Sequence, residues 1–114
     1  MSKQSLSLYS LALAASGAIA EARFVTPAGA QAGAGVNTLG VSQFEAADTE
    51  TVTVSVIGTA IVETGGAVAA GGLVESDASG RAIAKATGVA AARALPGQSS
   101  AGAGEFIEVL LIAN

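Results

Sequence analysis

The stretch "TVTVSVIGTAIVE" at residues 51–63 decides the fold class of this chain. Valines at positions 52, 54 and 56 alternate with hydroxyl side chains at positions 51, 53 and 55. This period of two, with β-branched residues almost throughout, is typical of a β-strand with one apolar and one polar face. Gly58 interrupts the run and predicts a bend or bulge where the strand changes direction or sheet.

On either side of this strand the chain divides into short apolar segments separated by turns rich in glycine. "LVES", the turn "DASG" at 77–80 and "RAIAKA" predict a hairpin. The Ala-rich segment 87–95 fits a short helix or a strand equally well. In all, further strands are expected at residues 17–25, 38–44, 73–76, 81–86 and 105–112.

Short strands at this spacing, joined by Gly-rich turns, are typical of a small β-barrel or β-sandwich. We therefore expect an all-β fold with Gly/Ala-rich loops, an extended N-terminal arm and at most one short helix. The last strand, 105–112, is apolar on both faces apart from Glu108. Such a strand is either central in a barrel or pressed against another subunit.

The N-terminal run "SLSLYSLALAASGAIAEA" at 5–22 has two interpretations. Lys3, the leucines and the triplet Ala18-Ile19-Ala20 resemble an export signal over residues 1–20. However, leucines alternate with serines as in a strand, and the alternation restarts after Tyr9-Ser10 as it would across a bulge. We therefore prefer an uncleaved arm over residues 1–16, followed by a single β-rich domain over 17–114. The run is too short, and has too many serines, for a transmembrane helix.

Composition limits how much stability the core can provide. Hydrophobic residues make up 51% of the chain, but 27 of them are alanines, and the sequence contains only three phenylalanines and one tyrosine. Alanine buries little area, and ordered glycines carry an entropic cost. A monomer of this composition should be only marginally stable, so we expect an oligomer or a larger assembly to supply further burial.

Charge and residue usage argue against several function classes. The net charge is −4 and the five basic residues are scattered, which disfavours nucleic-acid binding. Histidine and cysteine are absent, so the commonest general base, thiolate nucleophile and soft metal ligands are missing. We therefore expect no enzyme activity, catalytic residues, metal or cofactor.

Carboxylates are the remaining candidates for chemistry. Glu75 with Asp77 could share one face of an extended segment, a spacing that a calcium ion can also use. The other candidates are the pair Glu105 and Glu108 and the set Glu45, Asp48 and Glu50. Solvated acids flanking turns are the more economical interpretation of all three groups.

Several segments, in this order, resemble the small capsid cement, or decoration, proteins of tailed bacteriophages. They are Ala22-Arg23-Phe24-Val25, Gly40-Val41, Gly58-x-Ala60-x-Val62, "AGGLVESDASGRA" at 70–82, and Gly104-Glu105 before the last apolar strand. The resemblance runs from about residue 17 to residue 112 and leaves out residues 2–16.

The resemblance implies a β-rich domain, made in the host cytoplasm, that binds the outer surface of the phage head. There it would stabilise the lattice of major capsid protein, often as an oligomer, with a homotrimer expected first and a dimer second. No membrane or nucleic acid is implied as a partner. An exported β-sandwich adhesin, with residues 1–20 as its signal, is the alternative.

The arm offers candidate attachment residues. An extended arm can add a strand to a neighbour's sheet edge while its side chains fill pockets. We expect Leu6, Leu8, Tyr9, Leu11 and Leu13 to bind capsid protein or a sister subunit. The alternative is that the arm is simply the first strand of the protein's own barrel.

Overall fold

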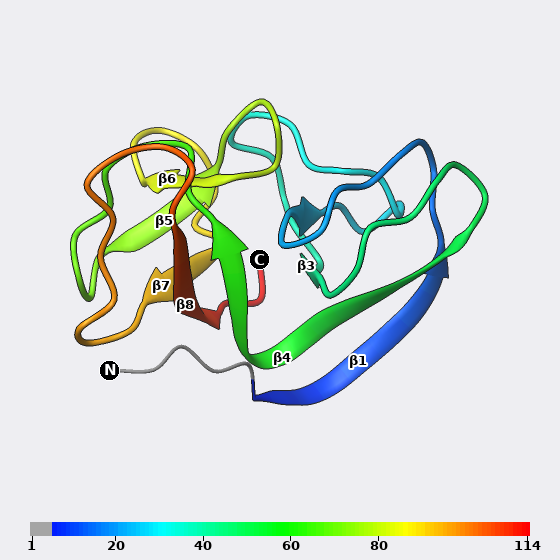
Figure 1. Cartoon of the computed structure of the whole chain (residues 1–114), viewed down its shortest axis with the longest axis horizontal. Helices are drawn as coiled ribbons and strands as arrows, with labels where there is room; N and C mark the ends of the chain where they lie inside the picture. The colour runs from blue at the N-terminus through cyan, green and yellow to red at the C-terminus, as the bar shows by residue number, and fades with distance from the viewer. Residues whose placement is uncertain (1–5) are drawn as a thin grey trace.

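The computed structural model describes residues 6–114 and is all-β, as the sequence predicts, with no helix in that range (Figure 1). The first five residues of the expected arm, including Lys3, lie outside the described part. The strands are β1 (Ser7–Ala14), β2 (Phe24–Val25), β3 (Gly40–Ser42), β4 (Thr51–Glu63), β5 (Leu73–Ser76), β6 (Ala82–Ala84), β7 (Ala92–Ala94) and β8 (Phe106–Leu111).

Strand β4 is shared by both halves of the molecule. Its first part, from Thr51 to Gly58, pairs with β1 along one edge and with β3 along the other. Its second part, from Thr59 to Glu63, pairs with β8. Figure 1 shows β4 turning sharply between these parts, and Gly58 there has a φ of 106°. The predicted change of sheet at Gly58 is therefore confirmed.

The C-terminal half is a small barrel that nearly closes. Its strands follow the order β4, β8, β7, β5, β6. Thr64, directly after β4, forms a parallel bridge with Ala82 of β6, and the Gly65 amide donates to the Ala82 carbonyl (2.8 Å). This bridge brings the last strand of the series back to the first.

Small side chains fill this barrel. The barrel strands contribute to its core Ala60, Val62, Val74, Ala82, Ala92, Ala94, Ile107 and Val109, all buried. A barrel of so few strands has a narrow interior that side chains alone fill. Alanines therefore serve as core residues here, although each buries little area.

The N-terminal half is built from β1, β2, β3 and the first part of β4. Its core cluster consists of Ala15, Ile19, Val25, Ala46, Val52 and Val54, with Leu13, Leu39 and Val56 packed against it. The alternate valines of β4 point into this cluster, as the sequence pattern predicts.

Polar contacts and one aromatic side chain join the two halves. Nη2 of Arg23, just before β2, lies 3.1 Å from Oε1 of Glu63 at the end of β4. The Phe24 amide donates to the carbonyl of Gly80 in the β5–β6 turn (2.7 Å). The Phe24 side chain is fully buried in the barrel cluster. The turn 77–80, predicted as part of a hairpin, therefore also connects the two halves through this hydrogen bond.

Several strand predictions are confirmed in part. The hairpin of β5 and β6 forms as predicted. Residues 17–25 form a strand only at Phe24–Val25, because Ala22 has a positive φ of 59° that interrupts extended backbone. Of residues 38–44, only Gly40–Ser42 are in a strand. The last strand is central in the sheet, between β4 and β7.

Residues 87–95 do not form a helix. Ala92–Ala94 is strand β7, with Ala92 and Ala94 buried and Arg93 exposed between them. The helix alternative is wrong because pairing with β5 and β8 and burial in the barrel outweigh the helix propensity of alanine.

Candidate functional site

The proposed attachment segment consists of Leu6, which directly precedes strand β1, and of residues within β1, which pairs antiparallel with β4. Its first residues are strongly exposed: Leu6 by 62%, Leu8 by 69% and Tyr9 by 53%. Tyr9 lies opposite Ile57 of β4, which is also exposed. Large apolar side chains that remain exposed together often mark an interaction site. We call Leu6, Leu8, Tyr9 and Ile57 the β1 surface.

The other two leucines face inward. Leu11 lies opposite Val54 and Leu13 opposite Val52, and directly opposed residues share a face of a sheet. Both leucines are partly buried, and Leu13 packs against the N-terminal core cluster. The structure therefore divides the predicted set into exposed residues before the register shift at Tyr9 and core-facing residues after it.

The exposed start of β1 is fixed to the bend of β4 by its backbone. The Leu6 amide donates to Oγ1 of Thr59 (2.8 Å), and the Thr59 amide donates to the Leu6 carbonyl (2.9 Å). A Cβ on Gly58 would overlap the Leu6 carbonyl oxygen, so only glycine allows the backbones of Leu6 and position 58 to lie this close together. The β1 surface is thus held on ordered backbone.

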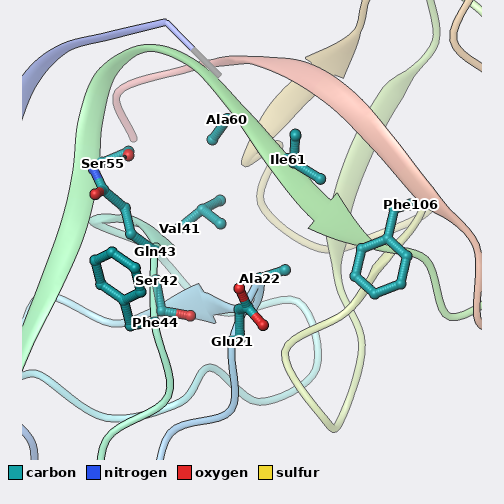
Figure 2. A pocket seen from close by; sticks show the side chains of 10 residues that line it. All are labelled: Glu21, Ala22, Val41, Ser42, Gln43, Phe44, Ser55, Ala60, Ile61 and Phe106. Carbon is teal, nitrogen blue, oxygen red and sulfur yellow. Dashed lines mark hydrogen bonds between the residues drawn. The ribbon is translucent and has the colours of Figure 1, made fainter. Parts of the chain in front are cut away.

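A pocket of about 320 Å³ lies in the bend of β4. Its walls include Val41 of β3 and Ile61 of β4. Phe44 and Phe106 lie on opposite sides of it, and the carboxylate of Glu21 lies between them (Figure 2). The lining is mostly apolar, and Glu21 is its only charged residue.

Most of the aromatic side chains of this protein are exposed, although their number in the sequence is small. Of the aromatic residues, only Phe24 is buried, whereas Tyr9, Phe44 and Phe106 are 53%, 63% and 45% exposed. The sequence predicts Tyr9 as a binding residue from its place in the N-terminal run, but it does not predict Phe44, Phe106 or Ile57. In a chain with so few aromatics, exposed ones are informative about binding.

Glu75 and Asp77, the first pair of carboxylates considered for catalysis or calcium binding, each accept backbone hydrogen bonds in a local turn. Oε1 of buried Glu75 accepts from the amides of Ala86 (2.6 Å) and Gly88 (3.1 Å). Oδ1 of Asp77 accepts instead from the amides of Ser79 (2.8 Å) and Arg81 (2.9 Å). The two carboxylates therefore stabilise separate turns, and their hydrogen bonds do not form a shared site.

The remaining acids are also separate. Asp48 accepts from the Gly17 amide (2.8 Å), and Glu50 accepts from the Ala47 amide (2.8 Å). Glu105 is exposed, whereas Glu108 is buried. Within residues 6–114, no three acidic side chains gather closely enough to hold a metal ion.

Comparison with known sequences identifies the family. The sequence model of the phage cement proteins matches residues 4–111. The chain belongs to this family. The matched range begins at residue 4, so it extends further toward the N-terminus than the segments that carry the resemblance, and it includes strand β1. A cement protein is a structural protein of the phage head, and this assignment disfavours the exported adhesin.

Comparison with solved structures supports the fold. The cement protein is similar to a chain described as "The crystal structure of head fiber gp8.5 N base in bacteriophage phi29". The TM-score is 0.73 at 12% sequence identity, over 91% of this chain and 93% of the other. No curated protein sequence matches. The described part of the cement protein contains no helix that could cross a membrane.

Proposed function

We propose that this cement protein binds the outer face of the assembled phage head and stabilises the lattice of major capsid protein through its β1 surface. The observation that carries the proposal is the exposure of Leu6, Leu8, Tyr9 and Ile57 on one strand pair of a cement-family domain. Apolar side chains of this size, fixed on ordered strands, bury substantial area against a partner at little entropic cost.

The free edge of β1 supports the same proposal. β1 pairs with β4 along one edge, and no other strand within residues 6–114 pairs with its second edge. Residues 7–14 carry no charge and no proline, the features that usually protect an edge strand from pairing. An extended segment of capsid protein can therefore add to this edge through backbone hydrogen bonds, with its side chains against Leu6 and Leu8.

The experiment compares point variants on undecorated heads from a phage that lacks this protein. We expect the double variant Leu6→Ser/Leu8→Ser to lose head binding at least about tenfold in co-sedimentation, since each leucine loses about 1.5–3 kcal/mol of burial. Val36→Ser is the matched control, because Val36 is exposed but lies outside the β1 surface. Equal binding by both variants would exclude the β1 surface.

Stabilisation is tested separately from attachment. Undecorated heads filled with DNA are heated with and without saturating protein, and DNA release is followed by dye fluorescence. A ligand that binds only the intact lattice must raise its transition temperature. We expect release at a higher temperature on decorated heads. Binding without such a shift would show an attached protein that is not a cement.

Self-association is the remaining part of the proposal. We expect self-association because an alanine-rich domain has little large apolar area to bury within one chain. The resemblance to cement proteins makes a homotrimer the first expectation and a dimer the second. Sedimentation equilibrium measures the mass directly. A monomer at micromolar concentration would contradict this expectation and leave attachment to the head as the source of further burial.

A further inference from the structure

The pocket in the bend of β4 has the chemistry of a site for a planar cation. Phe44 and Phe106 stand on opposite sides of it and are both largely exposed (Figure 2). Glu21 supplies the only charge in the lining. Aromatic faces attract cations, and a carboxylate adds a charged acceptor.

Glu21 is available for such a ligand. Its side chain is exposed, and within residues 6–114 it forms no hydrogen bond or ion pair. The other polar lining groups are engaged: Gln43 donates to Ser10 (3.0 Å) and to Ser55 (2.8 Å), and Ser42 donates to the Ala20 carbonyl (2.7 Å). The pocket therefore presents two aromatic walls, fixed polar groups and one free carboxylate.

We propose that this pocket binds the side chain of an arginine presented by a partner protein. The guanidinium would stack against Phe44 or Phe106 and pair with Glu21, while the aliphatic stem lies against Ile61. A guanidinium suits this site better than an ammonium because it is planar, more weakly hydrated and able to form two hydrogen bonds with one carboxylate. The volume, at the lower end for binding pockets, suits one long side chain rather than a larger ligand.

The proposal rests on the proposed function in taking the partner to be capsid protein. The pocket lies beside strand β1, because its lining residue Gln43 donates a hydrogen bond to Ser10, the neighbour of Tyr9 in the chain. Two contacts on one side of the domain, one apolar and one ionic, would fix its orientation on the head as well as its affinity.

The first test uses the free protein and does not depend on heads. Nα-acetyl-argininamide is titrated into ¹⁵N-labelled protein, with Nα-acetyl-citrullinamide as the uncharged match. We expect saturable shifts of the Gln43, Phe44 and Phe106 amides with a Kd in the millimolar range, at least about fivefold weaker for citrulline and for Glu21→Gln. Equal shifts by both compounds, or none, would overturn the proposal. Tighter binding of Nα-acetyl-lysinamide would overturn the preference for arginine.

The second test uses undecorated heads. We expect Glu21→Gln to weaken head binding about five- to tenfold at low salt, and Glu45→Gln, another exposed glutamate that lies outside this pocket, to leave it unchanged. If both variants bind heads like the unchanged protein, the pocket does not take a capsid arginine and the proposed function stands. If the unchanged protein itself fails to bind heads, the proposed function fails, and the titration still decides the ligand.

Discussion

Gly58 faces the carbonyl oxygen of Leu6 so closely that a Cβ at position 58 would overlap that oxygen. The contact occurs where β4 leaves the N-terminal sheet and enters the barrel. One glycine thus sets both the bend between the two halves and the position of the exposed leucines.

Gly58→Ala should therefore destabilise the protein by about 2–4 kcal/mol, because alanine meets both a positive φ and the Leu6 backbone. Urea unfolding followed by circular dichroism measures the loss. Gly102→Ala is the matched control, since a Cβ there would contact nothing within 4 Å, and it should change stability by less than about 1 kcal/mol. Equal losses of unfolding free energy in the two variants would show that the close contact between Gly58 and the Leu6 backbone is not needed for stability.

The leucines of β1 should separate into two classes. Leu13→Ala should cost about 1–2 kcal/mol of unfolding free energy, because Leu13 packs on the N-terminal core, whereas Leu8→Ala should cost less than about 0.5 kcal/mol. Thermal unfolding of the two variants checks this order. A reversed order would mean that β1 lies with its other face to the core. For the same reason, deletion of residues 2–14 is a poor test of attachment, because it also removes core contacts.

The sequence predicted the long strand, the bend at Gly58 and the final strand because alternation and β-branching are local properties. It could not predict which leucines are exposed, because the register shift at Tyr9 depends on pairing with β4. The sequence could not predict the pocket, because its walls come from residues that lie far apart in the chain, such as Glu21 and Phe106. Residues 87–95 stayed ambiguous because only burial in the barrel selects a strand there.

The ion pairs of Glu63 should contribute to the junction between the halves. Glu63 lies 3.1 Å from Arg23 and 3.8 Å from Arg81, so Glu63→Gln leaves two neighbouring guanidinium groups without that carboxylate. We expect a loss of about 1–2 kcal/mol in low salt that becomes smaller in 1 M salt. Urea unfolding at both salt concentrations measures it, with Glu45→Gln as an exposed control. A loss of unfolding free energy that is the same at both salt concentrations would show that Glu63 stabilises the junction by packing and not by its charge.

The narrow interior of the barrel leads to a prediction about enlarging its buried alanines. Ala94 is fully buried opposite Val109, whereas Ala84 is exposed in β6, and both lie in strands. Valine favours strands in general, so propensity alone would make both substitutions to valine neutral or stabilising. If the interior is filled by small side chains, Ala94→Val must instead displace its neighbours and cost about 1–3 kcal/mol, while Ala84→Val stays within about 0.5 kcal/mol. Guanidinium unfolding of the pair decides between these accounts: a stabilised Ala94→Val variant would mean that the barrel contains unused volume and that its alanines are not required by its width.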